Sequence, residues 1–525
     1  MSQVHLHQEL AASSERVVVK TQYGPVRGRR TANGAVAFLE LPYALPPGRF
    51  QDPEPLPPDF CYEDKEYISE SSYCAQPTND GQSNAGPFED KVGLGKPTEN
   101  PLFVNIVCPP QAPPQTGFPV KIYIHGGFLQ FGSPHGLSGQ AQYASAERSE
   151  VWVNIGYRLS VFGYLACDEP KVNGNFGFKD QWLALLWIYD NIKAFGGDPN
   201  NVTLTGLSAG AHSVHQILHH VSRLSSGEQA PFQTAILQSN SIVATPKTPA
   251  ELRPQFHALC RALQLDPDSP DVLATLRDPT KISSSQLTQA IETDAVGVEY
   301  GTFRGCLDDS WLAASPDPMA WQRGGDFARS LKAKGVRSIV VGELSEEWYL
   351  YAIAHPVHSM RDIEQNMERY YQTDIVKKML KHYRTLPDGA SDEEVMKLLG
   401  EIVSDGQVYL PVRILARDLL AADFPVVRYQ IRWTPEQVRP LGYVTHATDR
   451  AFWALRLPIL EPDQADIARQ WLDTIDVEIK YAEANGNQRG LREVLALKED
   501  KTIGWVEDDR WNAVMRLCEA LPGES

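Results

Sequence analysis

The strongest chemical signal in the chain is a serine with a glycine two places to either side, in Gly206-Leu207-Ser208-Ala209-Gly210. A β-branched, apolar run over 202–205 precedes it, and a helix-forming stretch follows at once. The glycines permit a turn so sharp that larger side chains would collide with the adjoining strand and helix. The turn places the hydroxyl at a helix N-terminus, which favours developing negative charge. The pattern predicts that Ser208 is a nucleophile.

Short β-branched and aromatic runs alternate with longer amphipathic stretches along the chain. We expect strands at 17–21, 120–125, 151–157, 202–205, 235–238, 336–341 and 426–431, and helices at 181–194, 209–224, 250–263 and 365–383. A further helix starts at Ser391, which can form a capping box with Glu394. Several strand candidates are almost wholly apolar, as strands covered on both faces are. The alternation predicts an α/β fold, with a mostly parallel central sheet flanked by helices.

The stretch from about 355 to 420 is dense in helical pattern and lies between two strand candidates. We expect it to be a helical cap inserted at one end of the sheet. Such an insertion usually covers a site and does not fold alone.

Composition and charge exclude several function classes. The 525 residues carry a net charge of −17, which argues against nucleic acid and anionic membranes as main partners. The first 20 residues do not have the pattern of a secretory signal, and no apolar run is long enough to span a bilayer. The seven cysteines are odd in number and widely scattered. They indicate reduced thiols in a cytoplasmic protein.

Beyond the serine motif, the chain resembles the type-B carboxylesterase family. Segments similar to the family's motifs are PYALPPGRFQDPEPLP at 42–57, TENPLFVNIVCP at 98–109, GYRLSVFGYL at 156–165 and a long segment at 174–210 that ends in GLSAG. The resemblance implies one large α/β-hydrolase domain over 1–525 and the hydrolysis of a carboxylic ester. It also implies two structural ion pairs, Arg49 with Glu99 and Arg158 with Asp180.

The resemblance also implies partners for Ser208. In α/β-hydrolases the nucleophile, the acid and the histidine follow one another along the chain. Aligned on Gly342, just after the strand candidate 336–341, the family's acid falls on Glu347. Glu343 and Glu346 are the rival carboxylates, and Trp348 replaces a small glycine of the family.

The histidine of the set comes from GYVTHATDRAFW at 442–453, which resembles the family's histidine motif. His446 takes the place of the general base, and Asp449 matches an acidic position of that motif.

The oxyanion hole is expected in the loop after the strand candidate 120–125, which reads His125-Gly126-Gly127-Phe128. Family members usually carry a third glycine where this chain has Phe128. Backbone N–H groups do the work, so Phe128 can still donate if its backbone reaches the required conformation. Gly127, Phe128 and Ala209 are therefore the expected donors. The ring of Phe128 should also narrow the acyl pocket.

These residues predict a serine carboxylesterase that acts on a small or medium, partly apolar ester through an acyl-enzyme on Ser208. One alternative is an acyltransferase that passes the acyl group to an acceptor other than water. A second is an inactive binding member of the family, although such proteins usually lack part of the triad. No cofactor or metal is expected: His212, His215, His219 and His220 share a helix, but no nearby cysteine or carboxylate completes a metal site.

Overall fold

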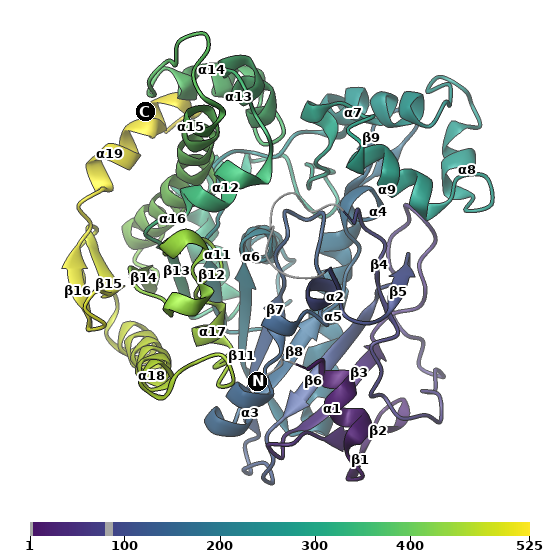
Figure 1. Ribbon diagram of the computed structural model, residues 1–525. Coiled ribbons are helices and arrows are strands. Elements are labelled where there is room, and N and C mark those ends of the chain that lie inside the picture. The colour runs from purple at the N-terminus through teal and green to yellow at the C-terminus, as the bar shows by residue number, and fades with distance from the viewer. Residues whose placement is uncertain (1–3, 79–87, 525) are drawn as a thin grey trace.

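The computed structural model describes residues 4–78 and 88–524 (Figure 1). Within them, twelve strands form one sheet in the order β1-β2-β3-β6-β8-β7-β11-β12-β13-β14-β15-β16. These strands are β1 (Arg16–Thr21), β2 (Gly24–Arg30), β3 (Val36–Pro42), β6 (Phe103–Cys108), β7 (Phe118–Ile124), β8 (Val151–Ile155), β11 (Gly197–Leu207), β12 (Thr234–Gln238), β13 (Ser338–Leu344), β14 (Val426–Ile431), β15 (Glu493–Leu497) and β16 (Ile503–Glu507). Two small sheets pair β4 (Ser72–Cys74) with β5 (Lys96–Thr98) and β9 (Ala166–Cys167) with β10 (Val172–Asn173).

The centre of the large sheet is parallel, from β8 through β7, β11, β12, β13 and β14 to β15. The remaining neighbours, at the two ends of the sheet, pair antiparallel. Every residue of β12 and β13 is buried, which explains their continuous apolar sequence. Because parallel strands end at the same edge, the residues that follow β7, β11 and β13 gather on one side of the molecule.

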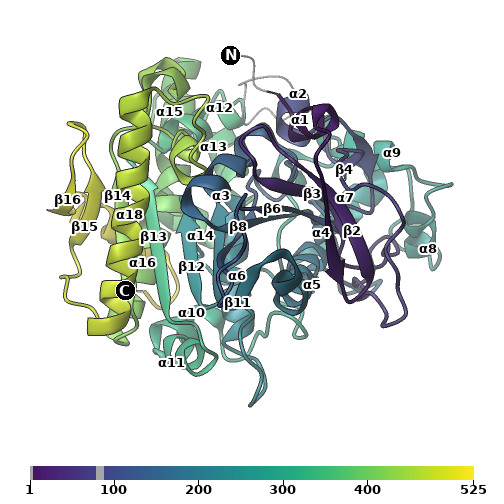
Figure 2. The same cartoon turned by 90° about the horizontal axis from the view of Figure 1, so that it is seen from below.

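Helices cover both faces of this sheet (Figure 2). Along β13, Ile339 and Val341 belong to the apolar core on the α16 side, whereas Val340 belongs to the core on the α18 side. This alternation is the period of two expected of a strand between two layers. The helices are α1 (Leu6–Ala12), α2 (Phe88–Val92), α3 (Gln142–Arg148), α4 (Ser160–Tyr164), α5 (Phe176–Asn191), α6 (Ala209–Val221), α7 (Pro249–Ala262), α8 (Val272–Arg277), α9 (Ser284–Glu292), α10 (Pro318–Arg323), α11 (Asp326–Ala333), α12 (Trp348–Ala354), α13 (Met360–Met367), α14 (Thr373–Leu380), α15 (Asp392–Ser404), α16 (Leu410–Ala421), α17 (Arg450–Trp453), α18 (Pro462–Asn485) and α19 (Trp511–Met515).

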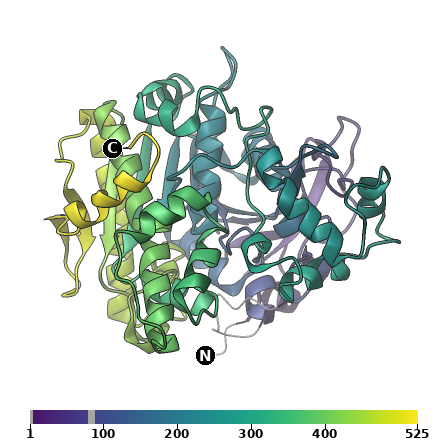
Figure 3. The same ribbon diagram turned by 90° about the horizontal axis from the view of Figure 1, so that it is seen from above.

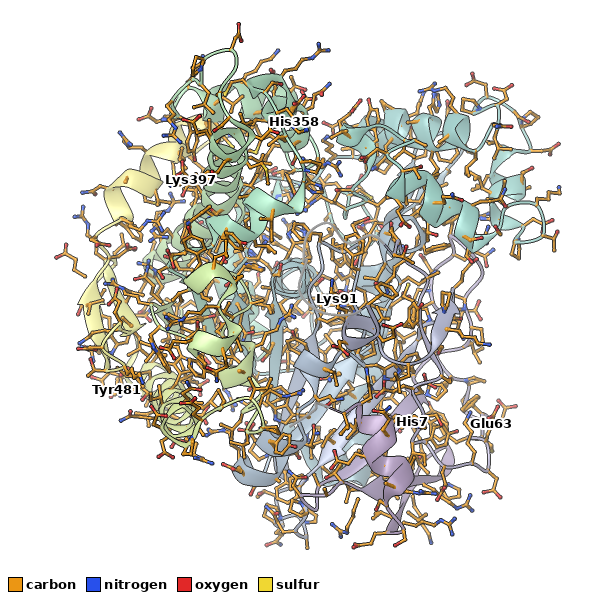
Figure 4. The ribbon with its side chains drawn as sticks, viewed as in Figure 1. His7, Glu63, Lys91, His358, Lys397 and Tyr481 are labelled. Carbon is orange, nitrogen blue, oxygen red and sulfur yellow. The ribbon has the colours of Figure 1, made fainter. Side chains whose placement is uncertain are left out.

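Two helical stretches separate neighbouring strands of the sheet: α7 to α11 lie between β12 and β13, and α12 to α16 between β13 and β14. Seen from above, the green helices α13 to α15 of the second stretch and the teal helices α7 to α9 of the first lie on opposite sides (Figures 1 and 3). His358, just before α13, and Lys397 of α15 mark the second stretch in Figure 4. Its apolar side chains form a separate core that also contains Phe128.

One helix was predicted wrongly. The expected helix over 365–383 is two helices, α13 and α14, because the chain turns at 368–372. The capping box is confirmed, since Ser391 Oγ accepts a hydrogen bond from the Glu394 backbone and α15 begins at Asp392.

Among the described residues, no helix combines the length and the apolar character needed to cross a bilayer. All seven cysteines are free, and only Cys61 is exposed.

Candidate active site

Ser208 lies on the sharp turn between β11 and α6. Its φ of 59° and ψ of −125° are strained for a residue with a side chain. The two glycines make the turn possible: a Cβ on Gly206 would clash with the Gly210 backbone, and one on Gly210 would clash with the carbonyl of Ile124. The Ser208 amide donates to the carbonyl of Gln238 at 2.8 Å, which fixes the turn against β12.

Glu347 and His446 are brought together from 99 residues apart in sequence. Glu347 is the N-cap residue of α12, directly after β13, and is fully buried. Its Oε2 lies 2.6 Å from His446 Nδ1, and its Oε1 accepts a hydrogen bond from the Leu344 amide at 2.9 Å. The carboxylate therefore fixes the orientation of the imidazole and favours the tautomer protonated on Nδ1.

The rival carboxylates are engaged elsewhere. Glu343 forms a buried, two-pronged ion pair with Arg413, with both distances 2.9 Å. Glu346 accepts a hydrogen bond from the Val444 amide at 2.7 Å and so holds the loop that carries His446.

The other side of the imidazole is open. His446 Nε2 is buried and has no hydrogen-bond partner within the described part of the chain, so it makes no hydrogen bond to Ser208. The ring of His446 contacts Tyr351 edge-on, with centroids 5.7 Å apart, and Tyr351 lines the pocket at Ser208. Hydrogen bonds of this kind are often long without substrate and shorten when substrate binds.

The loop after β7 approaches Ser208 closely. A Cβ on Gly126 would lie 2.9 Å from the Cβ of Ser208, so this position requires glycine. Gly127 and Phe128 have positive φ values of 119° and 58°, in the region that favours glycine. Within the described residues, the backbone amides of Gly127, Phe128 and Ala209 have no hydrogen-bond acceptor.

The pocket at Ser208 is small. Its volume is about 10 Å³, and Phe128, Leu129, Ala209 and Tyr351 are among its lining residues. The ring of Phe128 packs edge-on against Tyr351, with centroids 6.0 Å apart.

Burial controls the protonation of the groups around the site. It lowers the pKa of His125 to about 4, so this histidine is neutral at pH 7. It raises the pKa of Tyr351 well above the usual range, with help from the charge of Glu347. Burial raises the pKa of Asp449 to about 6, and the nearby Glu347 charge acts in the same direction, against a hydrogen bond from Trp453.

Both scaffold ion pairs are present. Arg158 contacts Asp180 through Nε at 2.8 Å and Nη2 at 2.6 Å, and both side chains are buried. Arg49 Nε donates to Glu99 at 2.7 Å.

Two histidines of α6 make hydrogen bonds to neighbouring backbone groups. His215 Nδ1 accepts a hydrogen bond from the Ile242 amide at 2.9 Å, and His220 Nδ1 lies 2.9 Å from the carbonyl of Trp311.

Several residues at the pocket were not predicted from the sequence: Asn240, Arg304, Tyr351 and Gln407. Gln407 lies in a π-helical turn, Asp405–Tyr409, and such turns are frequent at functional sites. Only Tyr351 had a usable signal, because it follows Glu347 by one helical turn.

The sequence and the fold match a known class of proteins. The model of the carboxylesterase family matches residues 15–480, and the chain therefore belongs to the carboxylesterase family. A carboxylic ester hydrolase of Gibberella moniliformis is 30% identical, over 94% of this chain and 93% of that protein. An uncharacterized esterase/lipase of Schizosaccharomyces pombe is 28% identical, over 93% of this chain and 92% of that protein.

A solved structure of a PNB esterase superposes with a TM-score of 0.72 at 25% identity, over 95% of this chain and 99% of that chain. The predicted family, α/β-hydrolase fold and enzyme class are confirmed: the chain is a serine carboxylesterase.

Proposed function

We propose that Ser208, His446 and Glu347 are the catalytic triad and that Gly127, Phe128 and Ala209 supply the oxyanion hole. The observation that carries this proposal is the buried contact of 2.6 Å between His446 Nδ1 and Glu347 Oε2, which leaves Nε2 free to act as a base. The strained turn at Ser208 and the three amides without acceptors support it.

The reaction follows from these positions. His446 Nε2 takes the proton of Ser208 Oγ as that oxygen attacks the ester carbonyl carbon. The carbonyl becomes a tetrahedral oxyanion, which accepts hydrogen bonds from the three amides. The C–O bond to the alcohol then breaks, and His446 returns the proton to the leaving alcohol. Water attacks the acyl-enzyme by the same route and releases the carboxylic acid and free Ser208.

The test is hydrolysis of p-nitrophenyl esters by wild type and Ser208→Ala, with Ser225→Ala, an exposed serine, as control. We expect Ser208→Ala to lose activity by roughly 10⁴-fold or more. Activity retained in Ser208→Ala would remove the mechanism. Adding candidate alcohol acceptors separates hydrolysis from acyl transfer, because a transferase forms mostly the new ester.

We propose further that residues 1–525 form one domain in which the segment from about 355 to 420 covers the site. The support is the shared apolar core in which Phe128 packs with residues of this segment, among them Met367, Leu398 and Leu399. A single cooperative unfolding transition, followed both by circular dichroism and by loss of activity, is the expected behaviour. A separate early transition of the segment would contradict it.

We propose a cytoplasmic location, supported by seven unpaired cysteines of which six are buried. Imaging of a fluorescently tagged chain is expected to show diffuse cytoplasmic signal, and signal confined to secretory compartments would overturn the proposal.

A further inference from the structure

Two cavities meet beside Ser208. The small pocket at the serine and a larger cavity of about 90 Å³ share three lining residues, His212, Arg304 and Gln407. Arg304 therefore lines both the pocket of the proposed nucleophile and this larger cavity.

The guanidinium of Arg304 forms no ion pair with any carboxylate of the described residues. Its neighbours are instead a histidine and a tyrosine ring. Its Nη2 lies 3.5 Å from His212 Nδ1, and its central carbon lies 5.2 Å from the ring centroid of Tyr370. Burial lowers the pKa of His212 well below its usual range, so this histidine is neutral and adds no second positive charge beside Arg304. Arg304 is half-buried. Withdrawing part of a cation from water without an anionic partner costs free energy, and an anionic ligand would offset that cost.

The backbone that carries Arg304 is held rigidly on both sides. Gln130 Nε2 donates to the carbonyl of Phe303 at 2.7 Å, and Asn175 Nδ2 donates to the carbonyl of Cys306 at 2.8 Å. Both amide side chains are buried. These hydrogen bonds fix the backbone from which the Arg304 side chain extends.

The larger cavity contains three cations and three carboxylates. Lys247 lies near Glu251 and Glu368, whose negative charges act to raise its pKa against the effect of burial. Arg369 lies 3.6 Å from Asp294. Glu299 is the third carboxylate of the lining, and its negative charge acts to raise the pKa of Arg369.

The charges of Lys247 and Arg369 are thus largely balanced, and that of Arg304 is not. The lining as a whole is neutral, but no carboxylate of the described residues lies within ion-pair distance of Arg304, whereas Arg369 has one. The planar fork of the Arg304 guanidinium suits a carboxylate.

We propose that the ester substrate carries a carboxylate, which binds to Arg304 while the ester carbonyl lies at Ser208. The inference rests on the proposed function of Ser208 and names a substrate class for it: monoesters with one free carboxylate on the acyl or the alcohol part.

Two matched substrate pairs test this, all releasing a nitrophenol. Mono-p-nitrophenyl adipate against p-nitrophenyl hexanoate places the charge on the acyl part. The 3-carboxy-4-nitrophenyl ester of hexanoic acid against p-nitrophenyl hexanoate places it on the alcohol part. The measured quantity is the ratio of kcat/KM for the anionic ester to that for the neutral one. We expect a ratio above one in wild type for at least one pair, falling about 10- to 100-fold in Arg304→Gln.

Arg329→Gln removes the same charge at an exposed site and is the matched control. The inference is overturned if both wild-type ratios are below one, or if Arg304→Gln changes the favoured ratio less than threefold beyond that control. If thermal unfolding shows that Arg304→Gln does not fold, the two wild-type ratios alone decide. Nitrophenol release that persists in Ser208→Ala refutes the triad instead. If Ser208→Ala is inactive but the ratio of kcat/KM does not differ between wild type and Arg304→Gln, only the role of Arg304 is refuted.

Discussion

Gln130 and Phe303 exchange two hydrogen bonds: Gln130 Nε2 donates to the Phe303 carbonyl at 2.7 Å, and the Phe303 amide donates to Gln130 Oε1 at 3.3 Å. The same Nε2 donates to the carbonyl of Phe128 at 3.1 Å. One buried side chain thus links the loop of two proposed oxyanion donors to the loop that carries Arg304. The proposed chemistry and the proposed substrate recognition share one structural support.

Replacing Gln130 by leucine should lower both the stability of the protein and its catalytic rate. The buried carbonyls of Phe128 and Phe303 would lose a donor, and we expect the free energy of unfolding to fall by about 1–3 kcal/mol. Because the oxyanion amides would be less well positioned, kcat should fall by roughly tenfold or more. Chemical denaturation and steady-state kinetics measure the two effects. Gln229→Leu, at an exposed position, is the control, and a stability loss with unchanged kcat would show that Gln130 has no positioning role.

Glu347→Gln tests the acid of the triad. The amide keeps the shape but loses the charge that steadies the imidazolium, so kcat should fall by about 10²- to 10⁴-fold with little change in KM. Glu346→Gln is the matched comparison, because it also replaces a carboxylate in this turn while keeping an oxygen for the Val444 amide. We expect an effect of less than about threefold there, since the Glu346 carboxylate accepts from the Val444 amide whereas that of Glu347 contacts the imidazole. Equal losses in the two variants would argue against Glu347 as the acid.

Phe128→Ala should widen the pocket at Ser208, which is only about 10 Å³ in volume. We expect kcat/KM for p-nitrophenyl octanoate, relative to the acetate, to rise by about tenfold, as one or more methylene groups gain a binding site. The cost is a free energy of unfolding lower by roughly 3–5 kcal/mol, because a buried ring is removed. An acyl-length profile identical to that of wild type would show that another group limits the pocket.

Asp449 should make stability depend on pH. Its pKa is raised to about 6 by burial and the nearby Glu347 charge, so the folded chain binds the proton more tightly than the unfolded chain. Between the two pKa values, stability therefore falls as pH rises.

Asp449→Asn removes the titrating carboxyl group and with it this pH dependence of stability. The free energy of unfolding of Asp449→Asn, minus that of wild type, should rise by roughly 2 kcal/mol between pH 4 and pH 7.5. Urea unfolding of both proteins at the two pH values measures it. A difference that does not change with pH would mean that Asp449 titrates alike in the folded and unfolded chains.

Much of this protein could be predicted from its sequence because the signals are local. Glycines two places either side of Ser208 report a turn whose backbone admits nothing larger, and the buried strand β13 is a continuous run of apolar residues. The family motifs placed Glu347 and His446 by position alone. The predicted helix over 365–383 was wrong because the apolar pattern continues across the turn that separates α13 from α14.

Only the tertiary structure decided which side chains meet. Glu347 and His446 contact each other because the parallel strands β13 and β14 end at the same edge of the sheet. Glu347 follows β13, and His446 lies in the loop that follows β14. Arg304 lies in a loop without regular structure, so no periodicity marks it, and its position depends on buried amides at 130 and 175 that are distant in sequence. Local sequence specifies backbone conformation, whereas the shape and charge of a pocket arise from long-range packing.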